Sequence, residues 1–245
     1  NMEDKKLKDA YNRAAENFLY TRTEGEDKSG FWNREVEQPL MFELVPKSLK
    51  GLLLLDVGCG PGIHVKEYEK RGAKCFGVDF SEEMIKLAKE RCPDSKFEVD
   101  NIYDLKFEDG SFDIVTASLA LDHLKDLSKG IDEIHRVLKR DGLLIFSVPH
   151  PIGNLFGDPD KGDHTLDGNY FDRREIYLDI AGGGADFVDY LRTFQDYLDI
   201  LLSKGFELLK LVENEPNEKW KKKYDGLNEA FFRMPFIYLF KFRKK

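Results

Sequence analysis

The feature that most constrains the fold is an apolar segment that runs directly into a glycine-rich turn. Leu52–Val57 is an apolar run closed by glycine, which is typical of a buried parallel strand. The next residues read Gly58-Cys59-Gly60-Pro61-Gly62 and lead into a stretch with helical spacing. Glycines let the backbone turn sharply and approach a ligand closely, and a helix start offers free N–H groups. The segment therefore predicts a ligand site at a strand–turn–helix junction.

The spacing of these glycines and one acidic residue narrow the kind of ligand. A dinucleotide site favours G-x-G-x-x-G, whose third glycine permits close helix packing beneath a pyrophosphate, whereas this chain has G-x-G-x-G. Asp56 stands just before the glycines. Its carboxylate would oppose a pyrophosphate and favour a ligand with an ammonium group. A purely structural turn is the alternative interpretation.

A second acidic residue follows the next apolar run. In Gly77-Val78-Asp79-Phe80-Ser81 the aspartate ends the second expected strand. Ligands of open α/β sheets bind outside the carboxyl ends of the strands, and a carboxylate there can accept hydrogen bonds from both hydroxyls of a ribose. Ser81 is also a good N-cap for the helix that follows, and the two roles are compatible.

Apolar runs and helical patterns alternate through the middle of the chain, and this order defines the expected fold class. It predicts an α/β fold with a doubly wound parallel sheet. A chain of 245 residues suits one such domain, residues 1–245, with residues 1–45 as a helical cap. The expected strands are Leu52–Val57, Lys74–Val78, Phe97–Val99, Phe112–Ala117, Leu143–Val148, Phe206–Val212 and Phe236–Phe240, and the expected helices include Leu7–Leu19, Val36–Leu44, Glu82–Arg91, Leu127–Lys139 and Thr193–Ser203.

The segment His150–Tyr190 differs from the rest, because it is polar and rich in glycine, proline, aspartate and aromatic residues. A long segment of this kind in a compact domain is usually a lid or a binding loop. Residues 150–190 are therefore expected to form a lid-like insertion after the fifth strand. Gly182–Gly184 would supply a hinge, and aromatic residues such as Phe156 an apolar wall. A homodimer contact or a mobile surface loop is the alternative.

Composition excludes several classes of partner. The net charge of −8 argues against nucleic acid, which is bound mainly through lysine and arginine at phosphates. Cys59, Cys75 and Cys92 lack zinc-ligand spacing, so no metal is expected. Their odd, sparse number and the polar first residues predict a cytoplasmic protein. No apolar run approaches the roughly 18 residues of a membrane span.

Four motifs carry a family resemblance: Asp56–Gly62, Gly77–Met84, Leu105–Asp113 and Val137–Leu143. Together they resemble class I S-adenosylmethionine-dependent methyltransferases, in the group that includes ubiquinone-biosynthesis-type enzymes. The resemblance implies S-adenosyl-L-methionine as the cofactor. It also implies a Rossmann-like seven-stranded sheet, mostly parallel with an antiparallel last strand.

The resemblance assigns cofactor roles to particular residues. The glycine turn would line the methionine half, and Asp79 would bind the ribose hydroxyls. From their spacing of seven, Tyr11 and Phe18 are expected to form one helical face that closes over the cofactor, with a core stripe as the alternative. Phe80 and Met84 would flank the adenine, and the backbone N–H of Ile102 would face its ring. Asn101 stands where such proteins often have Asp, so the adenine contact is left open between it and Asp100. His64 would contact the cofactor carboxylate. The complete expected set is Tyr11, Asp56, Gly58, Cys59, Gly60, Gly62, His64, Asp79, Phe80, Ser81, Met84, Asp100, Asn101, Ile102, Ser118 and Leu119.

The expected function is methyl transfer to a small-molecule acceptor by in-line displacement. The cofactor carries the reactivity, and the protein aligns and encloses it. A neutral hydroxyl or amine must also lose a proton, for which His123 and His150 are the candidate bases. The alternatives are a structural histidine at a helix start for His123 and a plain surface turn for His150. The rival functions are an S-adenosylmethionine-binding protein without transferase activity and a nucleotide-dependent oxidoreductase.

Overall fold

The computed structural model describes residues 2–24, 30–152, 169–178, 187–215, 217, 219–220, 232 and 234–245. Phe156 and Gly182–Gly184, which the sequence places in the lid-like insertion, lie outside these residues. Within the described ranges, no helix is long and apolar enough to cross a membrane. The helices are α1 (Met2–Thr23), the π-helix η1 (Trp32–Glu37), α2 (Gln38–Leu44), α3 (Ile63–Lys70), α4 (Glu82–Arg91), the short 3-10 helix η2 (Leu121–His123), α5 (Leu127–Val137) and α6 (Phe194–Ser203). The strands are β1 (Leu53–Val57), β2 (Lys74–Asp79), β3 (Lys96–Val99), β4 (Phe112–Ser118), β5 (Leu138–Pro149), β6 (Glu175–Leu178), β7 (Phe187–Tyr190), β8 (Phe206–Glu213) and β9 (Ile237–Lys244).

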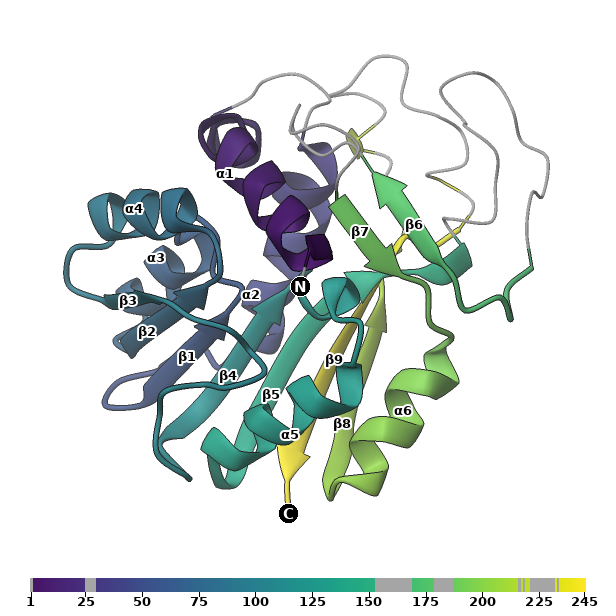
Figure 1. Ribbon diagram of the computed structural model, residues 1–245. Helices are drawn as coiled ribbons and strands as arrows, with labels where there is room; N and C mark the ends of the chain where they lie inside the picture. The colour runs from purple at the N-terminus through teal and green to yellow at the C-terminus, as the bar shows by residue number, and fades with distance from the viewer. Residues whose placement is uncertain are drawn as a thin grey trace.

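One seven-stranded sheet forms the centre of the molecule, with the order β3-β2-β1-β4-β5-β9-β8 (Figure 1). The pairs from β3 to β5 are parallel, and β9 is antiparallel to both of its neighbours. The expected Rossmann-like sheet with an antiparallel last strand is therefore confirmed. The strand order reverses between β1 and β4, and the crevice at such a reversal is where open α/β sheets bind ligands.

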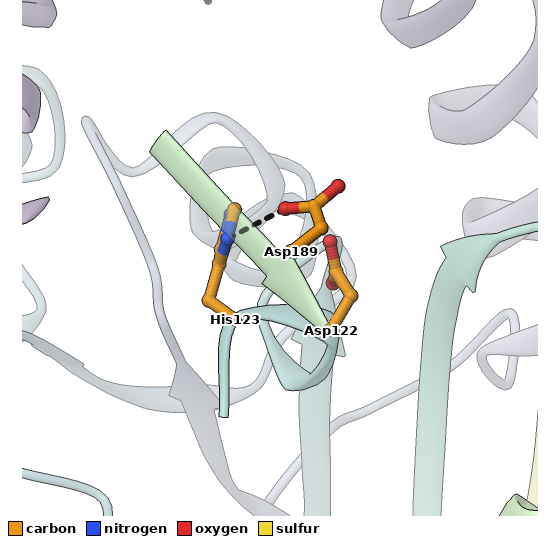
Figure 2. A group of neighbouring side chains, drawn as sticks. All are labelled: Asp122, His123 and Asp189. Atoms are coloured by element: carbon orange, nitrogen blue, oxygen red, sulfur yellow. Dashed lines mark ion pairs between the residues drawn. The ribbon is translucent and has the colours of Figure 1, made fainter. Parts of the chain in front are cut away.

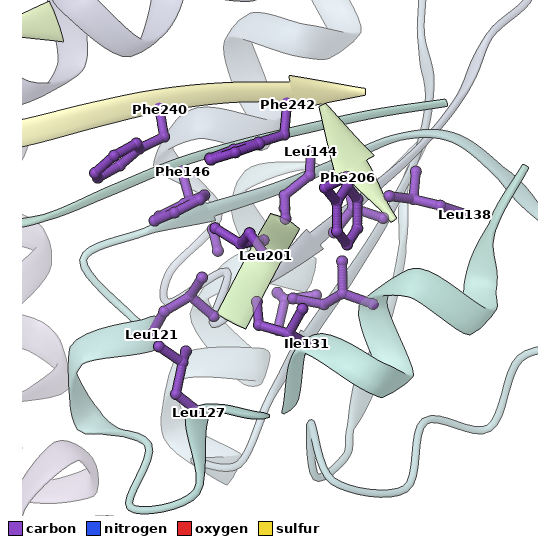
Figure 3. Close-up of a cluster of buried hydrophobic side chains, with 14 of the residues drawn as sticks. Leu121, Leu127, Ile131, Leu138, Leu144, Phe146, Leu201, Phe206, Phe240 and Phe242 are labelled. Atoms are coloured by element: carbon purple, nitrogen blue, oxygen red, sulfur yellow. The ribbon is translucent and has the colours of Figure 1, made fainter. Parts of the chain in front are cut away.

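Each face of the sheet carries its own apolar core, because successive side chains of a strand point to opposite faces. Leu144 and Phe146 of β5 pack with α5 and α6, whereas Ile145 packs on the opposite face with α2, α3 and α4. On the α5–α6 face the rings of Phe146, Phe240 and Phe242 are stacked, with the first two centroids 4.9 Å apart (Figure 3). The sheet is thus covered on both sides, as an apolar parallel sheet requires.

The helix α1 and the hairpin β6–β7 lie together over the carboxyl-end edge of the sheet (Figure 1). They meet in a small apolar cluster that includes Tyr11 and Ala14 of α1, Met84 of α4 and Phe187 of β7. The hairpin is the described part of the expected insertion. Whether the insertion opens and closes as a lid stays a prediction.

Candidate active site

The glycine-rich turn between β1 and α3 is tied by its backbone to the end of β2. The N–H groups of Gly58 and Cys59 both donate to the Val78 carbonyl, at 2.8 and 3.0 Å. The N–H of Gly60 donates to Asp79 Oδ2 at 2.9 Å. Gly58 and Gly60 have φ of 68° and 49°, which are left-handed values that favour glycine.

Asp79 supports this turn from the end of β2. Its Oδ1 accepts from the N–H of Ser81 at 2.9 Å, and its Oδ2 accepts from Gly60. Burial raises the pKa of Asp79 to about 6, against the lowering effect of these two donors. Each carboxylate oxygen has a second lone-pair direction, so Asp79 can still accept hydrogen bonds from a ligand.

A cavity of about 160 Å³ opens beside the glycine turn. Its walls come from that turn, from the carboxyl ends of β4 and β5, and from α1, η1, α2, η2 and the β6–β7 hairpin. The lining residues are Tyr11, Phe18, Arg22, Asn33, Gln38, Gly58, Cys59, Gly60, Pro61, Ile63, His64, Ser118, Leu119, Asp122, His123, Pro149, Leu178 and Asp189. The residues of this set that the sequence predicted for the site are Tyr11, Gly58, Cys59, Gly60, His64, Ser118, Leu119 and His123.

Two expected adenine neighbours lie outside this lining because α1 covers them. The ring of Tyr11 meets Phe80 edge-on, with the centroids 5.4 Å apart. Met84 is fully buried in the cluster beneath α1. Ser81 is also outside the lining, and its expected N-cap role is confirmed, because its Oγ accepts from the Met84 N–H at 3.2 Å.

The other three expected adenine residues, in the loop after β3, also lie outside the lining. Asp100 accepts from the backbone N–H groups of Asn101 and Lys106, at 2.9 and 3.1 Å. Asn101 accepts from the Tyr103 N–H at 3.0 Å. Ile102 packs against the core on the α5 side of the sheet. The loop is therefore held in shape by its own acidic and amide side chains.

Asp56 and Gly62 are placed differently from the expectation that they contact the ligand. Asp56 is 1% exposed and accepts from Thr116 Oγ1 at 2.6 Å, so its carboxylate is directed to β4. Burial raises its pKa to about 6, although His64 and Thr116 act against this. A Cβ at Gly62 would lie 3.3 Å from Ala88, so this glycine permits close packing of α3 against α4.

His150 is enclosed between the strands β8 and β9 rather than directed at the cavity. Its Nε2 lies 3.2 Å from Glu213 Oε1, and its Nδ1 accepts from the Ile152 N–H at 3.1 Å. Its ring centroid is 3.9 Å from that of Tyr238. Burial lowers the pKa of His150, partly offset by Glu213. The expected catalytic residue therefore lies outside the cavity lining.

A buried glutamate that the sequence did not single out joins the cap to the sheet. Glu37, at the end of the π-helix η1, accepts from Ser118 Oγ and Ser147 Oγ at 2.7 Å each and lies 3.0 Å from His64 Nε2. Burial would raise the pKa of Glu37, but His64 and the serines hold it below its usual value. The reverse interaction raises the pKa of His64 against burial. The pair is therefore a buried ion pair next to the cavity.

Arg22 supplies a second cation in the cavity wall, also unpredicted. Its guanidinium lies over the ring of Phe18, 3.2 Å from the centroid. Burial lowers its pKa to about 10, while Tyr11 and Glu37 act to raise it. Arg22 is therefore positively charged at neutral pH and faces the same space as the glycine turn.

A cluster of three neighbouring charged side chains, Asp122, His123 and Asp189 (Figure 2), also lines the cavity. His123 Nδ1 lies 2.7 Å from the Val188 carbonyl and 2.8 Å from Asp189 Oδ1, and its Nε2 lies 2.6 Å from Tyr11 Oη. Asp122 completes the cluster, and Asp122 and Asp189 are 5% and 4% exposed. Asp189 comes from the insertion, and its sequence gives no signal that this side chain reaches the cavity.

Known proteins resemble this chain in sequence and in fold. A methyltransferase-domain family model matches residues 55–146. A solved S-adenosylmethionine-dependent methyltransferase from Listeria monocytogenes is 28% identical, with a TM-score of 0.70, and the match covers 85% of this chain and 96% of that one. Another from Mesorhizobium loti is 25% identical, with a TM-score of 0.72 over 90% of this chain and all of that one. Residues 55–146 therefore form a methyltransferase domain, and the chain has the fold of the S-adenosylmethionine-dependent methyltransferases.

The curated relatives of this methyltransferase share less of their length. A Haemophilus influenzae protein without an assigned function is 37% identical over 130 residues, which are 49% of this chain and 50% of that protein. A ubiquinone/menaquinone biosynthesis C-methyltransferase from Geotalea uraniireducens is 36% identical over 112 residues, which are 41% and 48% of the two chains. The chain thus spans about half the length of the curated relatives it matches.

The residues present fit S-adenosylmethionine, the cofactor of this family. At Gly60 a Cβ would point into open space, with Phe18 as its nearest neighbour at 3.8 Å, so the glycine leaves room at the cavity for a ligand. Ser118 and Leu119 line the same space from the end of β4. Leu119 has a φ of 47°, and such strained residues gather at functional sites. Asp79 lies at the adjacent strand end but outside the cavity lining, so its contact with the ribose hydroxyls stays a prediction.

We expect Asp79→Ala to weaken binding of S-adenosylhomocysteine by about 1–3 kcal/mol, because charge-assisted hydrogen bonds would be lost. The loss also frees the Gly60 N–H that Asp79 now binds. Isothermal titration calorimetry measures the effect, with the exposed Asp94→Ala as the control. An unchanged dissociation constant in a folded Asp79→Ala protein would refute the ribose assignment.

Proposed function

We propose that this methyltransferase transfers the methyl group of S-adenosylmethionine to a small-molecule acceptor by in-line displacement. One observation carries the proposal: a single cavity joins the glycine turn, where the cofactor fits, to the Tyr11–Asp122–His123–Asp189 wall. The acceptor would lie between them. The helix α1 and the strand β7 cover this cavity, which supports a small molecule rather than a macromolecule.

The protein itself binds the cofactor and the acceptor, aligns them and excludes water from the reaction. S-adenosylmethionine, when bound, supplies the electrophilic methyl group. Arg22 in the cavity wall is placed to bind a carboxylate, which we assign to the methionine end of the cofactor in place of His64, because Glu37 already engages His64. Phe18 and Leu178 give apolar surface to the same space, and excluding water protects the transfer from competing reactions.

We also propose that the protein works in the cytoplasm without a nucleic-acid partner. Cys59, Cys75 and Cys92 are buried free thiols, which suits a reducing compartment. The net charge of −8 gives no electrostatic attraction to phosphates.

Calorimetry and a product assay test the proposed function in order. We expect S-adenosylmethionine and S-adenosylhomocysteine to bind and NAD not to bind. A panel of hydroxyl, amine and thiol metabolites is then screened for release of S-adenosylhomocysteine. Release with one chemical class of compound supports the transferase. Tight cofactor binding without release from any compound would instead favour a binding protein without transferase activity.

A further inference from the structure

Both ring nitrogens of His123 are already engaged. A carbonyl oxygen only accepts hydrogen bonds, so the Val188 carbonyl at 2.7 Å requires a proton on Nδ1. Nε2 is bound to the Tyr11 hydroxyl at 2.6 Å. A general base needs a free lone pair within reach of the proton it removes. In this arrangement His123 does not present one to the cavity.

The adjacent carboxylate has the capacity that His123 lacks. Asp122 lines the same cavity as the glycine turn and is 5% exposed. Its Oδ1 has no hydrogen-bond partner among the described residues, whereas Asp189 Oδ1 lies 2.8 Å from His123 Nδ1. A buried carboxylate oxygen without a partner is costly. Because Asp122 lines the cavity, its unpartnered oxygen points to a ligand that supplies the missing donor.

We propose that Asp122, and not His123, accepts the proton of the methyl acceptor, and that the acceptor is a hydroxyl or amine compound that carries this proton at neutral pH. The inference rests on the proposed methyl transfer. The proton passes from the acceptor oxygen or nitrogen to an Asp122 carboxylate oxygen, and the bonding pair stays on the acceptor atom to form the bond to the methyl carbon. The methyl–sulfur pair leaves with the sulfur, and Asp122 later returns its proton to solvent.

The groups packed around Asp122 explain how it can exchange a proton near neutral pH. Burial raises its pKa to about 7, aided by Asp189 on β7 and opposed by His123 and by Arg192 after β7. Tyr11 of α1 and Tyr197 of α6 also face it, and each is a phenol whose pKa burial and Asp122 raise. Burial would lower the pKa of His123, but Asp122 and Asp189 raise it to about 10. His123 is thus a fixed cation that balances Asp189, and Asp122 is the group left to titrate.

The first test uses the unliganded protein and does not depend on an acceptor. Carbon-13 NMR of the aspartate side chains should show the Asp122 carboxyl titrating near pH 7, with the signal assigned through its own backbone and absent from Asp122→Asn. Nitrogen-15 NMR should show both ring nitrogens of His123 protonated at pH 7.5. A neutral His123 with an unprotonated Nε2, together with an Asp122 that ionises below pH 5, would overturn the proposal.

The second test measures release of S-adenosylhomocysteine with the hydroxyl, amine and thiol panel over a range of pH. Asp122→Asn should lower kcat by about 100-fold to 10,000-fold and change the dissociation constant of S-adenosylhomocysteine less than twofold. Asp122→Glu should restore part of kcat, and the exposed Asp199→Asn is the matched control. Unaltered turnover in Asp122→Asn, or transfer confined to thiols, would contradict the base assignment.

The two tests separate the failure of this inference from that of the proposed function. If the wild-type protein releases no product with any compound, the proposed transfer fails, and the NMR titration still decides whether Asp122 is the proton-accepting group. If the wild-type protein transfers methyl groups and Asp122→Asn does so equally well, only the base assignment fails. A divalent cation such as Zn²⁺ that binds the cluster and shifts the His123 resonances would also overturn the assignment, because the carboxylates would then serve a metal.

Discussion

Glu37→Ala should destabilise the protein by about 3–5 kcal/mol, the usual cost of removing one partner of a buried ion pair. Glu37 is fully buried, and its loss would leave His64, Ser118 Oγ and Ser147 Oγ without their acceptor. Urea denaturation measures the change. Glu43→Ala is the matched control, because Glu43 is an exposed acid on the adjoining helix α2. Equal stability of the two variants would show that the pair does not anchor the cap.

The effect of Glu37→Ala should depend on pH in a defined window. The folded pKa of Glu37 is lowered, so its contribution is present above the unfolded pKa of a glutamate and is lost as the pH falls. The folded pKa of His64 is raised, so its contribution is complete below the unfolded pKa of a histidine and is lost as the pH rises. The difference in the free energy of unfolding between the wild type and Glu37→Ala should therefore be largest between about pH 4.5 and 6.5. A difference that does not vary with pH would contradict the ion pair.

Gly58→Ala should destabilise the protein by about 2–4 kcal/mol, because backbone strain and a clash add together. Its φ is 68°, and a Cβ there would lie 2.5 Å from Ala120 Cβ, behind the end of β4. Gly51→Ala is the matched control, because Gly51 has a φ of 82° and a Cβ added there would meet no atom within 4 Å. The control therefore measures backbone strain alone. If urea denaturation gives the same free energy of unfolding for Gly58→Ala and Gly51→Ala, the clash with Ala120 is refuted.

Gly60→Ala should weaken ligand binding more than it lowers the stability of the fold. Its φ of 49° carries the same backbone strain, of about 1–2 kcal/mol, but the nearest atom to its Cβ is Phe18 Cε1 at 3.8 Å. The added methyl group would enter the cavity. Calorimetry with S-adenosylhomocysteine should therefore show weaker binding in Gly60→Ala than in Gly51→Ala at similar stability. Equal affinity in the two variants would place the ligand elsewhere.

The sheet could be predicted because its signals are local. Each strand is a short apolar run, and the glycine turn follows β1 directly, so the order of elements and the covered parallel sheet follow from the sequence. The residues after the strands could also be assigned to one edge, since parallel strands end together. The π-helix η1 was missed: the expected helix Val36–Leu44 includes Glu37 but omits the start of η1 at Trp32.

The sequence predicted mainly those lining residues of the cavity that follow the carboxyl ends of the strands. Gly58, Gly60, Ser118 and Leu119 stand at strand ends and were placed correctly at one space by strand order alone. The carboxylate of Asp56 is directed to β4 because the pairing of β1 with β4 brings the Thr116 hydroxyl to it. His150 has no cavity contact because β8 and β9, distant in sequence, enclose it.

The sequence by itself determined the sheet and the glycine turn, because periodicity, turn chemistry and strand order act between neighbours along the chain. Only the tertiary structure decided which charged groups share the cavity. Asp189 of the insertion meets His123 after β4, and Glu37 of the cap meets His64 after β1. These pairings join segments whose separation leaves no periodic signal. Their interaction energies arise only once folding removes water from both partners. The protonation states at the site are therefore set by the tertiary structure and not by any sequence motif.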